Sequence, residues 1–472
     1  MTMSRKSYNI RKKSGKKRAD REKMAQMDLT QGNITKTLLK FAFPMICGNL
    51  LQQLYNVVDT LIVGQFLGAD ALAAVGSAYT LMTFLTSILL GMCMGSGAMF
   101  SIRFGEGNER KLKEDMFVSF LLIAAVTVVI NVSVFVFLDG IMSLLSVPQE
   151  VYGLMREYLW VIFWGIGGTF LYNYYASLLR AVGNSVVPLI FLGISAVINI
   201  VLDLYFVVAC GWGVAGAAFA TILAQWFSGA GLLFYKARKC PELKIGRQQM
   251  RVRKETVREV TGASVLTCLQ QSVMNLGILM VQGLVNSFGP AVMAAFAAAV
   301  KIDSFAYMPL QDFGNAFSTF IAQNHGAKKE DRIREGIRCA VRTAVVFAFC
   351  VSAVVVIFAR GFLLIFIQPQ ETEILAIGVS YLRVVGAFYV GIGGLFLLYG
   401  LYRAIGRPAM SLVLTVISLG TRVLLAYTLS AVPGIGVTGI WWAVPIGWAL
   451  ADVTGAGYYR YIRKKERKQA GG

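Results

Sequence analysis

The sequence predicts an all-α integral membrane protein in which twelve transmembrane helices form two pseudo-symmetric six-helix bundles around a central cleft. Three observations predict this fold, namely an apolar composition, a series of apolar segments of membrane-spanning length and an internal repeat. Of the 472 residues, 56% are apolar, which is far more than a single soluble core needs. We therefore expect the chain to lie in a lipid bilayer, where each crossing helix needs about 20 apolar residues.

Apolar runs of that length recur along the whole chain. In the first half they cover residues 38–64, 71–100, 117–138, 157–180, 186–209 and 214–235. In the second half they cover residues 260–287, 291–320, 340–366, 380–402, 409–430 and 437–459. These runs divide the chain into a basic N-terminal tail, an N-lobe of six spans, a linker, a C-lobe of six spans and a basic C-terminal tail. The bounds of the five regions are 1–36, 37–235, 236–259, 260–459 and 460–472.

The two halves of the chain repeat each other at an offset of 223 residues. The segment RAVGN at 180–184 recurs as RAIGR at 403–407, and GWGVAG at 211–216 recurs as GIGVTG at 434–439. An internal repeat in an apolar chain is typical of transporters built from two bundles, with a site between or within them.

Basic residues lie almost entirely in the two tails and in every second loop. These regions hold 39 of the 45 lysines and arginines, so the positive-inside rule places them in the cytoplasm. Both termini are then cytoplasmic, which requires an even number of spans. The net charge of +20 is thus explained by the basic residues of the cytoplasmic tails and loops. It does not indicate nucleic-acid binding, because no basic stretch is interleaved with base-stacking aromatic residues on a folded domain.

Motifs for ATP use and for catalysis are absent from the sequence. No Gly-x-x-x-x-Gly-Lys-Ser/Thr loop is present to hold nucleotide phosphates, so we expect no cofactor and an ion gradient as the energy source. An intramembrane aspartyl protease would carry Gly-x-Gly-Asp, whereas neither Asp59 nor Asp203 follows a glycine. The seven cysteines have no paired spacing, so disulfides and metal sites are not expected. The chain is therefore not expected to be an enzyme.

A polar stripe on the first predicted span points to a buried site. Its members follow the i, i+3, i+7, i+10 spacing of one helix face, and they are Asn49, Gln52, Asn56 and Asp59. A charge at bilayer depth is costly, so this face must contact protein or water rather than lipid.

The fifth span carries a second acid one helical turn after an amide. Asn199 and Asp203 share a face, and Thr221 on the sixth span offers a hydroxyl at similar depth. Together with Asp59 they form an oxygen-only set that suits a hard cation such as Na⁺. Two nearby carboxylates in a low dielectric cannot both ionise easily, so one of them could instead carry a proton. These residues leave both Na⁺ and H⁺ open as the bound ion.

The alternative is that the two acids have a structural role. In that case Asp59 and Asp203 lie in separate helix contacts, where other protein groups satisfy their hydrogen bonds. The repeat provides a control, because Asn199 corresponds to Arg422 and Asp203 to Ala426. A purely architectural role should survive in both copies. Loss of these residues from the second copy therefore favours a cation site in the first.

The second half carries intramembrane charges of its own on its eighth, tenth and eleventh spans. They are Lys301, Asp303, Asp312, Arg383 and Arg422. Lys301 and Asp312 are eleven residues apart and fall on one helix face, so we expect a structural or gating ion-pair network with Arg383 or Arg422. Direct contact of these charges with a substrate is the alternative.

Motifs spread over residues 29–460 match one known family. They are LLKFAFP at 38–44, QQLYNVVD at 52–59, GQFLGADALAAVG at 64–76, RAVGN at 180–184, NIVLD at 199–203 and QNHGA at 323–327. On these motifs the chain resembles the multidrug and toxic compound extrusion (MATE) family, in its bacterial DinF-like branch.

This resemblance implies alternating access between two lobes and export of amphipathic, often cationic compounds in exchange for Na⁺ or H⁺. It implies a multi-pass, monomeric protein of the bacterial plasma membrane, with drugs or toxic metabolites as substrates and lipids as neighbours. A lipid-linked oligosaccharide flippase of the same superfamily is the alternative. Such a flippase would need a cationic cleft for pyrophosphate, for which Lys301, Arg383 and Arg422 are the candidates.

The resemblance also assigns site residues. Members of this branch carry a first-lobe cation site, whose positions match Asp59, Asn199, Asp203 and Thr221. The expected lining of the first-lobe substrate cavity is Gln52, Tyr55, Asn56 and Tyr158. Other branches place acids on the seventh and tenth spans, where this chain has none.

Overall fold

The computed structural model describes residues 27–470, apart from 145–146 and 148. Residues 1–26 of the predicted basic N-terminal tail and residues 471–472 of the C-terminal tail lie outside the described part. Within that part the regular elements are all helical, which confirms the predicted all-α class.

Long helices follow one another along the chain. Those of the first half, here called the N-half, are α2 (Ile34–Leu67), α3 (Ala69–Gly105), α4 (Glu109–Val136), α5 (Leu138–Leu144), α6 (Gln149–Ile162), α7 (Ile166–Ala181), α8 (Val186–Asp203) and α9 (Gly213–Lys239). Those of the second half, the C-half, are α10 (Lys254–Asn286), α11 (Pro290–Gly326), α12 (Glu330–Leu363), α13 (Thr372–Gly386), α14 (Tyr389–Ala404), α15 (Pro408–Ser430) and α16 (Val437–Ala470).

The predicted spans all coincide with these helices, but the count of twelve is not established by length and composition. Eight helices of the described part are long and apolar enough to cross a membrane, and nine if α13 and α14, which meet at 50°, count as one bent span. The segments that fall short carry polar groups or breaks. They are α2 with its polar stripe, α16 with its charged end, and the α6–α7 pair, which is interrupted at Phe163–Gly165.

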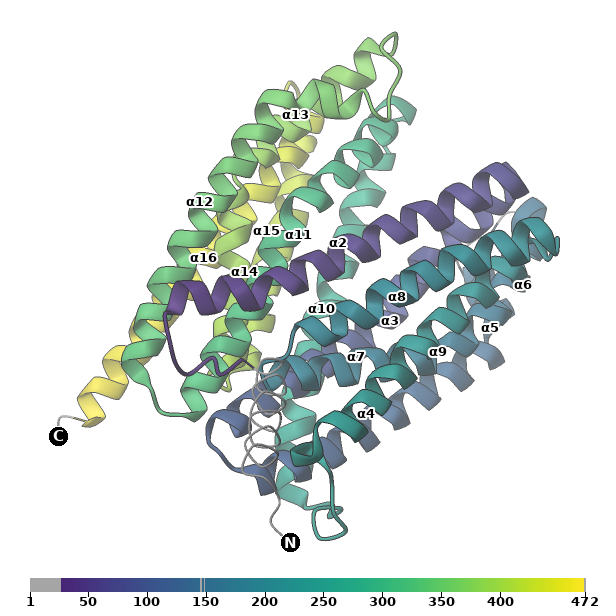
Figure 1. Cartoon of the computed structure of the whole chain (residues 1–472). Helices are drawn as coiled ribbons and strands as arrows, with labels where there is room; N and C mark the ends of the chain where they lie inside the picture. Colours follow the sequence, from purple (N-terminus) through teal and green to yellow (C-terminus); the bar gives the residue numbers. More distant parts are fainter. Residues whose placement is uncertain (1–26, 145–146, 148, 471–472) are drawn as a thin grey trace, which may run out of the picture.

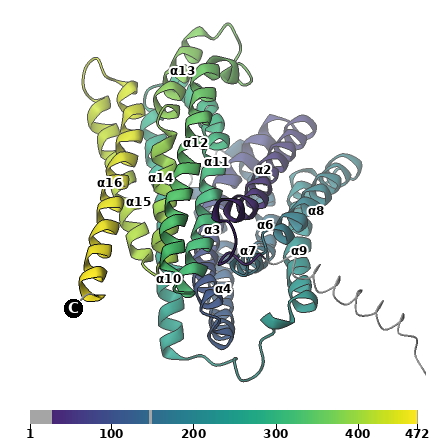
Figure 2. The same cartoon turned by 60° about the vertical axis from the view of Figure 1, so that its left-hand side comes forward.

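Two separate hydrophobic cores hold the molecule together. One is built from N-half residues between 62 and 243, and the other from C-half residues between 281 and 462. The beginning of α2 belongs to the second core, since Leu38 and Phe41 pack there. Figures 1 and 2 accordingly show α2 running between the other N-half helices and α11. The first helix is therefore shared by both bundles.

The two halves meet along α3, where small residues allow close approach of the backbones. A Cβ atom on Gly105 would overlap the carbonyl group of Gln323, so only glycine fits there. The Ser96 and Ser264 hydroxyl groups form a hydrogen bond of 2.8 Å across the same contact. The Gln323 amide donates to the Ala181 carbonyl at 2.8 Å. These contacts join α3 and α7 to α10 and α11.

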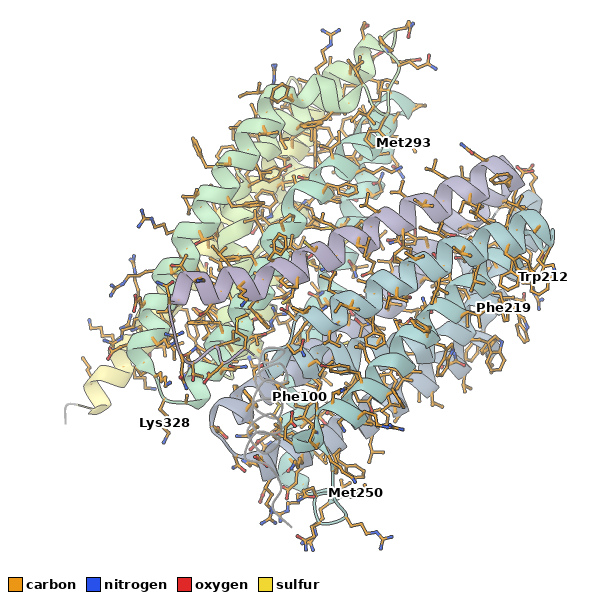
Figure 3. The ribbon with its side chains drawn as sticks, viewed as in Figure 1. Phe100, Trp212, Phe219, Met250, Met293 and Lys328 are labelled. Carbon is orange, nitrogen blue, oxygen red and sulfur yellow. The ribbon has the colours of Figure 1, made fainter. Side chains whose placement is uncertain are left out.

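Basic loops and loops with few basic residues lie at opposite ends of the molecule. Lys328, between α11 and α12, and Met250, between α9 and α10, lie toward the end that holds the interhalf contacts (Figure 3). Trp212, before α9, and Met293, at the start of α11, lie toward the other end. The basic loops that the sequence predicts to be cytoplasmic therefore lie at the end where α3 and α7 contact α10 and α11.

A short segment before α2 ties the halves together on that side. The Met27 amide donates to the Gly183 carbonyl of the N-half at 3.0 Å. Arg332 of the C-half donates to the carbonyls of Leu29 and Gly32, at 3.2 and 2.7 Å. Leu29 is fully buried. The described residues 27–33, which fall within the predicted tail 1–36, are therefore held by contacts with both halves.

Candidate functional site

A polar cavity of about 380 Å³ lies between the two halves. The N-half contributes residues of α2, α3, α6, α7 and α9, and the C-half contributes residues of α10, α11 and α14. The predicted site residues that line this cavity are Gln52, Tyr55, Asn56, Asp59, Tyr158, Thr221 and Asp312. Residues far apart in the chain therefore surround one space.

Two acidic side chains meet at the N-half wall of the cavity. Asp59 on α2 and Asp203 at the end of α8 lie close enough to share a hydrogen bond when one carboxyl group is protonated. Asp203 is fully buried and lies behind the lining, whereas Asp59 borders the cavity. The pair thus connects the interior of the N-half with the cavity.

The other two residues of the predicted cation site lie beside this pair. The Asn199 amide donates to the Thr221 hydroxyl at 3.3 Å, which joins α8 to α9. Asn199 is buried one turn before Asp203, and Thr221 borders the cavity. The fold therefore brings the four predicted residues together, on helices α2, α8 and α9.

Four oxygen atoms of this cluster lack hydrogen-bond donors. Asp59 Oδ1, Asn199 Oδ1 and both carboxyl oxygens of Asp203 are buried without a partner in the described part of the chain. Burying an acceptor without a donor is unfavourable, and burying an unpaired carboxylate is more so. A bound cation or a proton would remove this unfavourable burial. The lack of donors at these oxygens could not be predicted from the spacing of residues in the sequence.

The backbone next to the acid pair is irregular. Directly after Asp203 the chain forms a π-helical stretch, Leu204–Ala209, before the turn that leads to α9. Such stretches are rare and often occur at functional sites. Here it follows the acid that lies deepest in the N-half.

Aromatic and amide groups surround the acid pair on the cavity side. Tyr158 lies near both carboxyl groups and near Tyr55. Gln52 lies within hydrogen-bonding reach of Tyr55. These side chains offer hydrogen bonds and ring faces to a molecule in the cavity, without a fixed charge of their own.

The five charged residues that the sequence singles out in the C-half form no salt bridges with one another in the described part of the chain. Asp303 accepts a hydrogen bond of 3.2 Å from the Tyr381 hydroxyl and lies near Arg422. Lys301 and Arg383 are exposed, and Lys301 lies 5.8 Å from the centre of the Phe366 ring.

Asp312 stands apart from the other C-half charges because it faces the central cavity. It accepts a hydrogen bond from Asn49 of α2, so it joins the two halves. Eleven residues of α-helix span about 16 Å, so Lys301 cannot share partners with Asp312 although the two lie on one face. In the described residues no salt bridge joins Lys301 or Asp312 to Arg383 or Arg422, so the expected ion-pair network remains a prediction.

Two arginines that were not among the predicted site residues also line the cavity. Arg180 on α7 and Arg403 on α14 are equivalent positions of the repeat. Arg403 is buried and donates to Asn315 at 2.9 Å, and Arg180 lies near Asp312. Their recurrence in both copies of the repeated motif was the available signal.

Comparison with known proteins agrees with the geometry. The family model described as MatE matches residues 44–205 and 263–428. The chain is 29% identical over 448 residues to "Probable multidrug resistance protein YpnP" of Bacillus subtilis, with 94% of this chain and 99% of that protein covered. It is 25% identical to "Probable multidrug resistance protein NorM" of Thermotoga maritima, with 86% and 88% covered.

Solved structures share the fold. One is described as "Outward-facing conformation of a multidrug resistance MATE family transporter of the MOP superfamily", with a TM-score of 0.87 at 22% identity. It covers 93% of this chain and 98% of its own. Another, "Crystal structure of MATE in the bent conformation", also has a TM-score of 0.87, and covers 94% and 98%. The arrangement of helices is therefore that of these transporters.

Proposed function

Because the chain belongs to the MatE family, we propose that it is a secondary active exporter of amphipathic, often cationic small molecules. In this proposal the energy comes from Na⁺ or H⁺, which enters as the substrate leaves. The protein acts as a monomer in the bacterial plasma membrane, with both termini in the cytoplasm.

The acid pair carries this proposal. Asp59 and Asp203 are buried together with carboxyl oxygens that lack donors, and Asp59 also borders the central cavity. An ion bound between the acids satisfies these oxygens. A substrate in the cavity can then compete with the ion through Asp59, so that each expels the other during the transport cycle.

Alternating access fits the contacts between the halves. The halves touch along α3, α10 and α11 on the side of the basic loops, which closes that side. Export requires these contacts to separate, so that the cavity opens to the cytoplasm and loads substrate. The small-residue contact along α3 is suited to this because it has few side chains to disengage.

The coupling ion is tested with the purified protein in liposomes. Dye efflux is measured under a Na⁺ gradient alone and then under a pH gradient alone, with protein-free liposomes as the control. We expect one of the two gradients to drive efflux. Absence of gradient-driven efflux under both conditions would contradict the antiport proposal.

A lipid-linked oligosaccharide flippase is the second candidate, and one observation favours it. Arg180 and Arg403 both line the cavity and offer a cationic surface for pyrophosphate. Lys301 and Arg383, which were the candidates from the sequence, are exposed instead. Deletion of a drug exporter should raise drug susceptibility, whereas deletion of a flippase should impair envelope synthesis.

A further inference from the structure

A second cavity lies between α3 of the N-half and α10, α14 and α15 of the C-half, and Tyr458 of α16 also contributes to its wall. It encloses about 800 Å³, which is within the range of small-molecule sites. We call it the lateral groove. The central cavity and the lateral groove share Arg403 in their walls.

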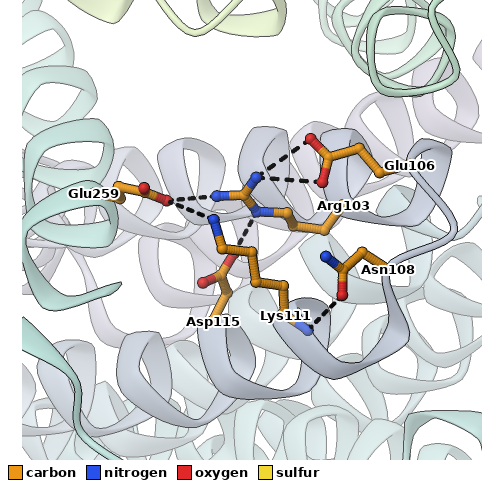
Figure 4. Close-up of polar contacts among 6 residues, drawn as sticks. All are labelled: Arg103, Glu106, Asn108, Lys111, Asp115 and Glu259. Carbon is orange, nitrogen blue, oxygen red and sulfur yellow. Dashed lines mark hydrogen bonds and ion pairs between the residues drawn. The ribbon is translucent and has the colours of Figure 1, made fainter. Parts of the chain in front are cut away.

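The groove is lined by an excess of positive charge. Four arginines, Arg103, Arg258, Arg403 and Arg407, line it, against a single acid, Glu259. Arg103 and Glu259 form a salt bridge with each other. As Figure 4 shows, Arg103 contacts Glu259 as well as Glu106 and Asp115. Three arginines therefore remain without a neutralising partner from the groove.

None of these three forms a salt bridge within the described part of the chain. Arg258 and Arg407 are exposed, and Arg407 only donates to the Tyr458 hydroxyl at 3.3 Å. Arg403 is buried and donates to Asn315, a neutral amide. Guanidinium groups in such an arrangement suit phosphate oxygens, which they can bind through two parallel hydrogen bonds.

The rest of the groove wall is apolar. Met99 and Ile102 come from α3, Leu266 from α10, and Met410 and Val413 from α15. Val413 is 46% exposed, so the apolar part of the wall is open to the protein surface. The groove thus combines a cationic part with an apolar part, as an amphipathic ligand requires.

We propose that the lateral groove binds an anionic glycerophospholipid of the cytoplasmic leaflet. Its phosphate lies at Arg258 and Arg407, and its first acyl methylenes lie between Ile102 of α3 and Met410 of α15. The predicted topology places these helix ends at the cytoplasmic surface, where anionic headgroups are found. The N-terminus of α15, which begins at Pro408 in the groove, adds a favourable dipole.

The bound lipid would favour the closed arrangement of the halves. One wall of the groove belongs to α3 and the others to the C-half, so the complete groove exists only while the halves are in contact here. Separation of α3 from α10 dismantles the site. Anionic lipid therefore stabilises the state that is closed on the side of the basic loops.

The test measures the thermal unfolding temperature of the full-length protein in a neutral detergent. Phosphatidylglycerol, phosphatidylcholine, glycerol 3-phosphate and inorganic phosphate are titrated separately. The variants are Arg258→Ala/Arg407→Ala, its charge-retaining counterpart Arg258→Lys/Arg407→Lys, and the control Arg247→Ala/Arg251→Ala. The control removes two exposed arginines of the linker outside the groove.

Phosphatidylglycerol alone should raise the unfolding temperature of the wild type. The half-maximal concentration should rise about 30-fold in the double alanine variant, and much less in the lysine variant. An equal effect of inorganic phosphate would replace the lipid by a free anion and overturn the proposal. An equal loss in the linker control, or none in the double alanine variant, would also overturn it. If the alanine variant does not fold, the lysine variant and the soluble phosphates still decide.

Discussion

The buried acids Asp59 and Asp203 of the N-half and Asp303 of the C-half differ in the groups that surround their carboxyl oxygens. In the N-half, Asp59 and Asp203 face each other, and both oxygens of Asp203 lack a donor. In the C-half, the Asp303 carboxyl group accepts a hydrogen bond from the Tyr381 hydroxyl and lies near Arg422. Asp303 therefore has a hydroxyl donor and a guanidinium group nearby, although its Oδ1 also lacks a donor. In the described residues Asp59 and Asp203 form no salt bridge, which is consistent with the proposed cation site.

The repeat makes this difference visible position by position. Asn199, Asp203 and Thr221 correspond to Arg422, Ala426 and Val444 in the second copy. Each of these three proposed ligands is thus replaced by an apolar side chain or by a permanent cation, and a permanent cation at Arg422 would repel a second cation bound beside it. The same helical frame therefore presents buried carboxyl and amide oxygens in one copy, which we propose to bind an ion, and a fixed positive charge in the other.

Removal of the acid that borders the cavity should have the largest effect. Asp59→Asn keeps the shape of the side chain but removes the charge that attracts an ion and holds a proton. We expect gradient-driven dye efflux in proteoliposomes to fall to the level of protein-free liposomes. The matched C-half variant Asp303→Asn should retain efflux. Normal efflux by Asp59→Asn, with the protein present in the membrane, would refute the acid-pair mechanism.

Converting one ligand to its C-half counterpart should have a smaller effect on coupling. Thr221→Val removes a hydroxyl of about the same size as the methyl group that replaces it. Loss of one polar contact should weaken the apparent affinity for the coupling ion about tenfold, with the maximal efflux rate retained. The measurement is efflux rate against ion concentration. An unchanged ion dependence would remove Thr221 from the site.

A change in the C-half pair should affect stability rather than coupling. Tyr381→Phe removes the donor to the Asp303 carboxyl group. An unsatisfied buried acceptor costs about 1–3 kcal/mol, so the unfolding temperature in detergent should fall. The ion dependence of efflux should not change. A shift in that dependence would mean that the C-half also takes part in coupling.

The smallest effect is expected where the segment before α2 joins the halves. Arg332→Ala removes hydrogen bonds to the carbonyls of Leu29 and Gly32. Amide hydrogen exchange of residues 29–36 should become faster, while the two cores stay protected. Arg338→Ala, which removes an exposed arginine from the same helix, is the control. Equal exchange in both variants would show that the segment does not depend on Arg332.

Helix positions and the N-half acids were predictable because both depend on local patterns. Apolar runs placed every long helix, and the helical stripe of α2 aligned Asp59 with Gln52 and Asn56. The contrast between Asp203 and Ala426 could be predicted by aligning the two copies of the repeat. The C-half charges were harder, because spacing shows which residues share a face and gives no information on which neighbour that face meets.

Contacts between distant segments account for what sequence analysis missed. Arg180 and Arg403 line the central cavity only because α7 and α14 converge there. The lateral groove likewise depends on α3 lying against α10 and next to the start of α15. The sequence places residues 27–32 in the basic N-terminal tail, whereas in the structure hydrogen bonds from both halves hold this segment in place.

The sequence by itself determined the all-helical class, the two related halves and the retention of Asn199 and Asp203 in only one of them. These features follow from periodicity and composition, which act over one or two helical turns. The tertiary structure alone decided that Asp59 meets Asp203 without donors, that Lys301 stays apart from Asp312, and that arginines of both halves share cavities. Those outcomes depend on how whole helices pack, and packing joins residues whose separation along the chain carries no information about their distance in space.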